Sequence, residues 1–423
     1  MIKKIFSNEL MRGSLILFIT FNIFNLLNFI FQFSMARMLG PADFSVLASI
    51  MTLLYFLALP SESIQTIVSR YTSKFNVKKE NGKIKNLLIK SLKKSSLVAL
   101  ILFILLLPIF FLFGYFLDIP FSLVALSGVV LFSFFLIPTT RGVMQGMKKF
   151  GALGSNMILD SLIKVVIAVI LVYLGFGVYA AVGSIIIGGL VALSISLIPL
   201  KDVMKSKIES ADLSGIYKYG SPVIIIFLPI LLMQSIDVFL ARRFFSPEIA
   251  GHYAVANLIG KMIFFGTLAI GKTMFPLSSE KFENSGSDNS KTRKIFYKSL
   301  IMVLSLCGLS LIALLLFPDL IIRLLFGNEY LEISSIVFNI GVAFTFISVA
   351  NIILLYGLSI NKKIGIKYLA SFIIFVFIQA VLLWFLKDNL LNFSIGMIIS
   401  CLLLFLGSML ILLKKPDEAN KKA

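Results

Sequence analysis

The strongest pattern in the sequence is a series of apolar runs, each about 20 residues long, separated by short polar segments. A run of that length crosses a hydrocarbon core of roughly 30 Å as a helix, which satisfies its own backbone hydrogen bonds in lipid. The pattern therefore predicts an all-α integral membrane protein with about twelve transmembrane helices. We place these helices at residues 14–35, 44–67, 95–117, 120–145, 155–175, 178–200, 216–241, 248–272, 297–317, 334–360, 364–387 and 391–413.

Lys and Arg are distributed unevenly among the polar segments. With the N-terminus inside the cell, 32 of the 39 Lys and Arg fall in cytoplasmic segments, and the loop at 67–95 holds the largest group. This bias follows the positive-inside rule and predicts a multi-pass protein of the cytoplasmic membrane with both termini in the cytoplasm. The net charge of +19 is thereby explained by topology, and we expect no nucleic-acid partner.

Composition agrees with a membrane protein, since 59% of the residues are hydrophobic and only 14% are charged. Both cysteines, Cys307 and Cys401, lie inside apolar runs, so we expect no disulfide framework. The stretch 278–294, rich in Ser, Asn, Gly and Asp, is typical of a flexible cytoplasmic linker.

An internal repeat relates the two halves of the chain. The segment from Ala36 to Pro41 after the first run matches the segment from Ala241 to Pro247 after the seventh, and further weak matches follow at offsets of about half the chain. We therefore expect two six-helix bundles, 1–210 and 211–423. Six spans in each half would give both bundles the same orientation, with a site between them near the membrane midplane.

Several segments resemble a known group of proteins. "FSMARMLGPADFSVLASI", "RGVMQGMKKFGALGSNMILDSLIKV" and "QSIDVFLARRFFSPEIAGHYAVANLI" are similar to segments of polysaccharide flippases. Those proteins belong to the multidrug/oligosaccharidyl-lipid/polysaccharide exporter superfamily, and the similarity covers most of the chain.

The resemblance implies a MATE-like transporter whose two bundles form a V around a central cavity. It also implies a cargo, a sugar chain on a polyprenyl or dolichyl diphosphate, that is flipped from the cytoplasmic to the outer leaflet by alternating access for cell-surface glycan assembly. The alternative is a MATE-type drug/cation antiporter on the same fold. Implied partners are the lipid-linked sugar, membrane lipids, a coupling Na⁺ or H⁺, and glycan polymerases or glycosyltransferases.

Charges inside the spans are the most informative positions, because a charge at the bilayer centre costs about 2.5–3.5 kcal/mol on insertion scales. Lys164 follows Asp160 by four residues, so the two side chains share a helix face. Lys261 has Asn257 one turn away and no acid within four residues. We expect these cations to line a cavity, where they would contact the diphosphate. For Lys164 the alternative is a purely structural pair with Asp160.

Asp237 lies about one turn before Arg242 in the seventh span. It is a candidate cation or proton site or a partner for sugar hydroxyls, and the alternative is a salt bridge to Arg37 or Arg242. The two arginines occupy matched places in the repeat, where they would bind phosphate or extend to lipid headgroups.

Polar residues at the inner ends of the second and fourth spans predict an entry vestibule for the headgroup, in which Arg141 and Gln145 would contact the cargo. The alternative is an ordinary cytoplasmic gate or contact with lipid headgroups. These residues are Glu62, Gln65, Arg70, Arg141 and Gln145.

No catalytic or metal-binding motif is recognisable. The single histidine, His252, precludes a metal site built from several histidines, and no P-loop is present. We therefore expect a protein that is not an enzyme and has no cofactor. A twelve-span facilitator is disfavoured because the loop after the second span lacks that group's short motif.

Overall fold

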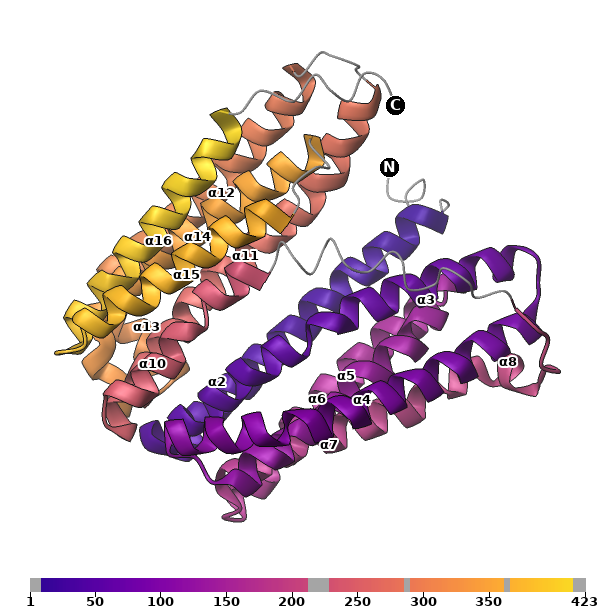
Figure 1. Cartoon of the computed structure of the whole chain (residues 1–423), viewed down its shortest axis with the longest axis horizontal. Helices are drawn as coiled ribbons and strands as arrows, with labels where there is room; N and C mark the ends of the chain where they lie inside the picture. The colour runs from indigo at the N-terminus through magenta and orange to yellow at the C-terminus, as the bar shows by residue number, and fades with distance from the viewer. Residues whose placement is uncertain (1–8, 212–227, 285–289, 361–365, 414–423) are drawn as a thin grey trace. The chain divides into compact units, whose positions relative to one another are not determined.

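The computed structural model describes residues 9–211, 228–284, 290–360 and 366–413, and the regular elements of these residues are all helices (Figure 1). Contacts divide the chain into two compact units, Met1–Ile224 and Ile225–Ala423. The boundary between the units lies outside the described residues. That each unit has six transmembrane helices stays a prediction.

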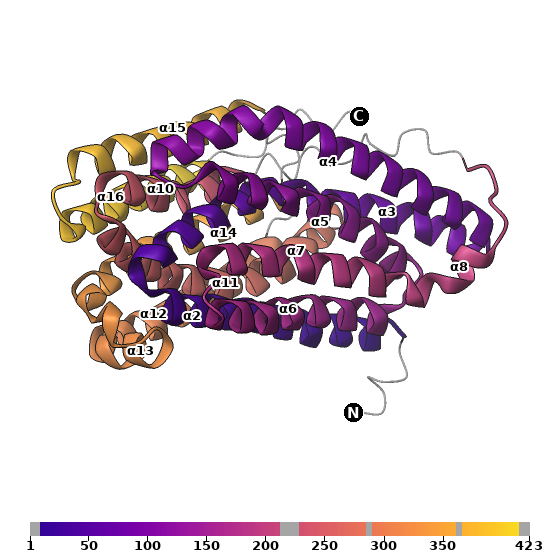
Figure 2. The same cartoon turned by 90° about the horizontal axis from the view of Figure 1, so that it is seen from below.

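In its described residues the first unit contains seven α-helices and one 3-10 turn, coloured indigo to magenta in Figure 1. They are α2 (Glu9–Leu57), α3 (Leu59–Val77), α4 (Asn81–Leu117), α5 (Phe121–Gly146), α6 (Phe150–Tyr173), α7 (Gly177–Ser196), the 3-10 turn η1 (Ile198–Leu200) and α8 (Lys201–Lys205). Helix α5 packs against α3, α4 and α7, and α6 packs against α2 and α7 (Figure 2). This arrangement places α5 at the centre of the unit, whereas α6 lies at its periphery.

The first two predicted spans form one bent helical path. Gly40, at φ 74°, interrupts the helical backbone inside α2, and Pro41 restarts it. A positive φ is accessible to glycine at little cost, and proline is tolerated where a helix begins. A second break at Ala58 precedes α3, whose first turn contains Pro60. The predicted span 44–67 is thus divided between α2 and α3.

Helix α4 shows where the membrane boundary lies. Its outward side chains change from Lys90, Lys93 and Lys94 to the exposed Leu97 and Leu100. From Leu97 to the helix end the chain rises about 30 Å, which matches the hydrocarbon core. The predicted span 95–117 is therefore the membrane part of a longer helix, and its first fourteen residues extend beyond the hydrocarbon.

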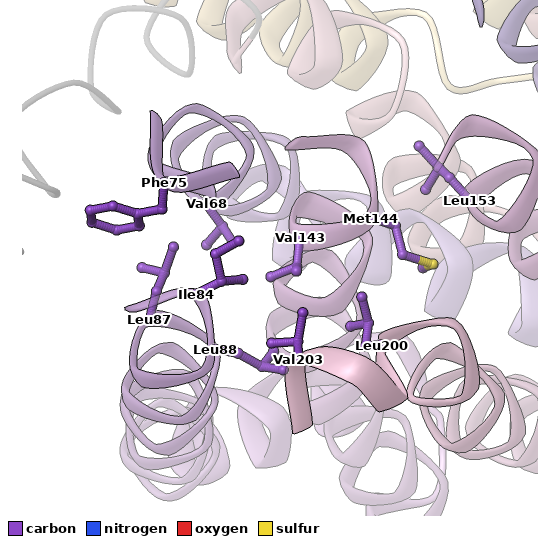
Figure 3. Close-up of a cluster of buried hydrophobic side chains, with 10 residues drawn as sticks. All are labelled: Val68, Phe75, Ile84, Leu87, Leu88, Val143, Met144, Leu153, Leu200 and Val203. Carbon is purple, nitrogen blue, oxygen red and sulfur yellow. The ribbon is translucent and has the colours of Figure 1, made fainter. Parts of the chain in front are cut away.

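The extended end of α4 packs against α3, α5 and α8 in a separate hydrophobic core, which we call the α8 core (Figure 3). Lys85 reinforces it by donating to the carbonyls of Met204 and Ser206, at 2.5 and 2.9 Å. This packing explains why α3 and α4 are longer than the apolar runs that predicted them. The α8 core comprises Val68, Phe75, Ile84, Leu87, Leu88, Val143, Met144, Leu153, Leu200 and Val203.

The second unit is built around α11 and α14. Its elements are α10 (Ile236–Phe244), α11 (Pro247–Asn284), α12 (Ser290–Leu316), α13 (Pro318–Leu325), the 3-10 turn η2 (Asn328–Ile333), α14 (Ser334–Ile360), α15 (Ile366–Phe385) and α16 (Leu390–Leu413). Helix α14 packs against α11, α12 and α16, and α15 packs against α10 and α16. The side chains of α14 are largely buried, which is consistent with the innermost position in this unit.

The predicted flexible linker over 278–294 is wrong at both of its ends. Helix α11 continues to Asn284 and α12 begins at Ser290, and only 285–289 lie outside the described residues. Lys281 in the last turn of α11 complements the helix dipole. Polar composition here marks helix that continues beyond the apolar run, as it does in α4.

Nine helical stretches within the described residues are long and apolar enough to cross a membrane. The first, Leu15–Val77, covers two predicted spans, and the others correspond to eight more. The seventh span lies partly at 212–227, outside the described residues, and the described apolar part of the eleventh, Phe372–Phe385, is shorter. The protein is a multi-pass membrane protein, and the total of twelve crossings stays a prediction.

Candidate functional site

Two groups of polar side chains lie within the helices, one in each unit. The first, which we call the α5–α6 cluster, consists of Asn28, Arg141, Asn156, Asp160 and Lys164. The second, the α10–α11 cluster, consists of Asp237, Tyr253, Asn257 and Lys261. Each cluster contains a predicted intramembrane cation together with residues that the sequence interpretation had not included.

Arg141 is held by two acceptors on α6. Its Nη2 donates to Oδ2 of Asp160 at 2.8 Å, and its Nε donates to Oδ1 of Asn156 at 2.8 Å. Asn156 in turn donates to the carbonyl of Ala192 on α7 at 2.7 Å. The side chains of Arg141 and Asp160 are only 12% and 19% exposed. Buried charges need this kind of pairing, so the network joins α5, α6 and α7.

Lys164 lies near the middle of α6, and its ammonium contacts two neutral groups. Its ammonium donates to Oδ1 of Asn28 on α2 and lies 4.8 Å from the centre of the Phe31 ring. Asn28 also donates to Oγ of Ser161 at 3.4 Å. An amide oxygen and an aromatic face stabilise a cation without neutralising it.

Asp160 and Lys164 share a helix face, but they do not form an ion pair with each other. Asp160 makes its salt bridge with Arg141, and its effect on Lys164 is a Coulomb attraction. Gly188 on α7 permits the close packing beside them, because a Cβ there would lie 3.1 Å from the Asp160 carbonyl. The positive charge of Lys164 is therefore the one that remains available to an anion in this cluster.

The α10–α11 cluster surrounds a buried carboxylate. Asp237 is 0% exposed, and its Oδ2 accepts hydrogen bonds from the Tyr253 hydroxyl at 2.7 Å and the Asn257 amide at 2.6 Å. Lys261, 6% exposed, interacts with Asp237 through Coulomb attraction. The structure thus gives Asp237 partners on α11, whereas the sequence interpretation had named Arg37 or Arg242.

The predicted gate residues divide into two kinds. Gln65 on α3 donates to Oε1 of Gln145 on α5 at 2.9 Å, which links the two helices. Glu62 and Arg70 are exposed on α3. Arg141, one turn before Gln145, belongs to the α5–α6 cluster instead. Their joint role as a gate stays a prediction.

Arg37 and Arg242 lie next to the helix breaks that the repeat had marked. Arg37 is exposed and precedes the break at Gly40, whereas Arg242 is partly buried near the end of α10, before Pro247 begins α11. The matched segments therefore form similar local structures, in which a proline starts the next helical segment. Binding of phosphate by these arginines stays a prediction.

Three members of the clusters were missed from the sequence. Asn28 and Asn156 are amides within apolar runs, and Tyr253 precedes Asn257 by four residues on α11. A rule that considers uncharged polar residues inside spans, together with charged ones, would have selected the two asparagines. Tyr253 is not distinguishable from a packing aromatic without the position of Asp237.

Solved structures with the same fold span nearly the whole chain. An inward-facing multidrug resistance MATE family transporter of the MOP superfamily shares 15% identity and a TM-score of 0.74, over 92% of this chain and 95% of that one. The lipid II flippase MurJ, in an inward closed conformation, shares 14% identity and a TM-score of 0.70, over 95% and 88%. At these identities the likeness establishes a MATE-like fold.

A third similar structure is a MOP superfamily transporter from Pyrococcus furiosus, described as having a binding pocket of reverse polarity. It shares 17% identity and a TM-score of 0.59, over 96% of both chains. Among curated proteins none matches the chain significantly.

The family comparison covers most of the chain, with the whole α10–α11 cluster and every member of the α5–α6 cluster except Asn28. Residues 34–335 match the family model described as "Polysaccharide biosynthesis protein". That segment begins just before the break at Gly40 and includes α5, α6, α10 and α11 in full. The chain therefore belongs to this polysaccharide biosynthesis protein family.

Proposed function

We propose that the protein is a flippase that moves a lipid-diphosphate-linked oligosaccharide from the cytoplasmic to the outer leaflet for cell-surface polysaccharide assembly. The sugar and diphosphate would pass through a polar path while the lipid tail remains in the bilayer, which avoids the cost of burying polar groups in hydrocarbon. The two units, with 1–210 and 211–423 as the proposed bundles, would alternate between inward and outward access. The protein itself would catalyse no covalent step.

The observation that carries this proposal is the set of contacts made by Lys164. It is a cation near the middle of a membrane helix, it contacts an amide oxygen and a ring face, and its neighbouring acid is paired with Arg141. Insertion of such a charge is costly, so a function that requires a cation accounts for it. The anion that we propose is the diphosphate of a lipid-linked sugar, which is consistent with membership in a polysaccharide biosynthesis family.

Topology and partners follow from the same proposal. Both termini would lie in the cytoplasm, as the charge bias predicts. The exposed Lys side chains at the extended end of α4 would then lie in the cytoplasm, where lipid-linked sugars are made. Glycosyltransferases and a glycan polymerase are the partners expected before and after the flipping step.

A drug/cation antiporter is the second candidate function. Its support is the buried carboxylate of Asp237 together with the fold shared with multidrug transporters. The intramembrane cations Lys164 and Lys261 disfavour it, because they would repel a cationic drug.

The energy source is a separate part of the proposal. A diphosphate diester carries about two negative charges, and moving them outward across an inside-negative potential of 100 mV releases about 4.6 kcal/mol. The membrane potential would therefore suffice without a coupled Na⁺ or H⁺, whose use is the alternative.

The test uses cells that produce the protein, with its gene deleted and then supplied again as wild type or variant. We expect the deletion to accumulate a polyprenyl- or dolichyl-diphosphate-linked sugar on the cytoplasmic leaflet. Lys164→Met should slow export at least about tenfold, because one charge-assisted hydrogen bond is lost. Lys164→Arg should retain most of it.

Lys90→Met is the matched control, because it removes an exposed Lys from α4 and should leave export unchanged. Unchanged levels of every lipid-linked sugar in the deletion strain would refute the flippase function. Loss of cationic dye efflux in the same strain would instead favour the antiporter.

A further inference from the structure

The N-terminal half of α2 has three faces, and each has a different composition. The first face packs against α6 within the same unit (Figure 2). Its residues follow the spacing of one side of a helix. The residues whose contacts with α6 or with the core beside it define this face are Leu17, Thr20, Asn28 and Phe31.

The second face is aliphatic. Its residues are between 37% and 57% exposed and recur at intervals of three or four positions, so they also lie along one side of the helix. Apolar, exposed side chains of this kind suit contact with lipid tails. Helix α2 therefore has one face for protein and one for lipid. The lipid face consists of Ile19, Ile23, Leu26 and Ile30.

The third face combines amides with aromatic rings, and we call it the amide stripe. Its residues follow one another at intervals of four, three, four and three positions. At 3.6 residues per turn the three faces each take about a third of the helix circumference, so the amide stripe faces neither α6 nor the side with the aliphatic residues. The amide stripe consists of Phe18, Asn22, Asn25, Phe29 and Gln32.

Two amides of the stripe lie at hydrocarbon depth without a partner from another helix. Asn22 and Asn25 are about 10 and 15 Å along the helix from Leu15, where the described apolar stretch begins. Asn22 is exposed and donates to the carbonyl of Phe18 in its own helix at 2.7 Å. Asn25 is partly buried and makes no hydrogen bond with another described residue. Since an amide without a partner is costly in hydrocarbon, the stripe requires a polar ligand.

The stripe begins beside the cation that we propose for the diphosphate. Asn28, which accepts from the ammonium of Lys164, lies at the edge between the α6 face and the stripe. A diphosphate bound by Lys164 would therefore lie at the level of Phe29. The group attached to that diphosphate would reach Asn25 and Asn22 about one and two turns further along α2.

The composition of the stripe suits a sugar better than a second phosphate. An amide both donates and accepts, as a sugar hydroxyl does, whereas a phosphate oxygen binds most strongly to a charged donor. The face of an aromatic ring can also stack on the apolar C–H face of a pyranose. Amides and rings in alternate turns therefore offer both kinds of contact that a sugar makes.

We propose that the amide stripe binds the sugar next to the diphosphate, with Asn22 and Asn25 bonded to its hydroxyls and Phe18 and Phe29 stacked on its ring. This inference rests on the proposed function. It adds the part of the protein that distinguishes a sugar-bearing lipid from a bare lipid diphosphate.

The experiment measures the binding of two lipids to the purified full-length protein in nanodiscs. One lipid is polyprenyl diphosphate without a sugar, and the other is polyprenyl-diphosphate-linked N-acetylglucosamine. The wild type should bind the sugar-bearing lipid about tenfold more tightly. Asn22→Leu/Asn25→Leu should lose this preference, because two neutral hydrogen bonds are removed, and should bind the bare lipid as the wild type does. Lys164→Met should weaken the binding of both lipids.

Two controls separate sugar binding from a structural role. Ile23→Ala/Leu26→Ala changes the lipid face at the same depth and should leave the affinities for both lipids unchanged. Asn25→Gln keeps an amide and should retain more of the preference than Asn25→Leu. Because leucine is apolar and a good helix former, the double Asn variant should fold with a thermal unfolding midpoint no lower than that of the wild type.

Three outcomes would overturn the proposal. The first is a double Asn variant that keeps the wild-type preference for the sugar-bearing lipid. The second is an equal loss of affinity for both lipids, since the amides would then support the cation. The third is a lower unfolding midpoint or a changed oligomeric state, since the amides would then pair with protein. A wild type that binds neither lipid would refute the proposed function as well, whereas each of these three outcomes refutes the role of the stripe alone.

Discussion

Arg141 and Lys164 are neighbouring cations on α5 and α6, but their contacts give them different roles. Two nitrogens of the Arg141 guanidinium are engaged by Asp160 and Asn156, in an arrangement that suits its planar geometry. Lys164 contacts a neutral amide and a ring. Arg141 therefore supports the cluster, and Lys164 is the candidate cargo contact.

This difference predicts that Arg141→Met destabilises the protein. The variant leaves the carboxylate of Asp160 without its cation, and breaking a buried pair by removing one member costs about 3–5 kcal/mol. We expect a lower thermal unfolding midpoint in detergent and less folded protein in the membrane. Arg141→Met/Asp160→Asn should recover part of the loss, because no unpaired charge remains.

The exposed Arg70 provides the control, and Arg70→Met should leave the midpoint unchanged. If Arg141→Met keeps wild-type stability while losing transport, Arg141 contacts cargo directly and the division of roles between the two cations is incorrect.

At the scale of elements, close helix contacts position the gate residues. On α5, Gly142 and Gly146 are four residues apart and face α3. A Cβ on Gly142 would lie 2.7 Å from the Gln65 carbonyl oxygen, and a Cβ on Gly146 would lie 2.5 Å from the Ser69 carbonyl oxygen. Small residues at this spacing let membrane helices approach closely. The hydrogen bond between Gln65 and Gln145 depends on this approach.

Gly146→Ala should therefore separate α3 from α5. A methyl group at this position meets the backbone of α3, which has little room to yield, and overpacking of this kind costs about 1–3 kcal/mol. The thermal unfolding midpoint should fall. The yield of cross-linking between cysteines introduced at positions 65 and 145 should be lower in Gly146→Ala than in the protein that keeps Gly146.

Gly151→Ala is the matched control, because nothing lies within 4 Å of its added Cβ at the start of α6. Alanine favours a helix over glycine by about 1 kcal/mol, so this variant should be neutral or slightly stabilising. Equal effects of the two substitutions would show that α3–α5 packing is not set by Gly146.

Element ends show where sequence interpretation was sufficient. The membrane parts of α4, α6 and α12 follow from apolar periods, since lipid imposes one strong requirement on side chains and backbone. The continuations of α4 and α11 were not predicted because their sequences are polar. The helical state of the α4 continuation depends on the α8 core, which is made of segments that are distant in the sequence.

At the scale of the whole molecule, the sequence identified the intramembrane charges but not their partners. Intramembrane charge marks Lys164, Asp237 and Lys261 because each is costly in lipid. Which acid pairs with which base depends on helix packing, which a single sequence does not specify. The hydrogen bonds of Asp237 with Tyr253 and Asn257, 16 and 20 positions away, require the turn from α10 into α11.

The net arrangement of charge leads to the last prediction, that an imposed potential alone drives flipping. In proteoliposomes carrying a fluorescent polyprenyl-diphosphate sugar, a potassium diffusion potential of 100 mV, negative on the cytoplasmic side, should favour the outer leaflet. Two transferred charges correspond to about 4.6 kcal/mol, or about three orders of magnitude in the leaflet ratio at equilibrium. Reversing the potential should reverse the direction, because the sign of the work on the diphosphate changes while every protein contact stays the same. Choline should replace Na⁺ throughout without loss, and protein-free liposomes provide the background rate. Flipping that ignores the potential and follows a Na⁺ or H⁺ gradient would show that the energy comes from a coupled ion, and that the charge on the cargo does not drive its movement.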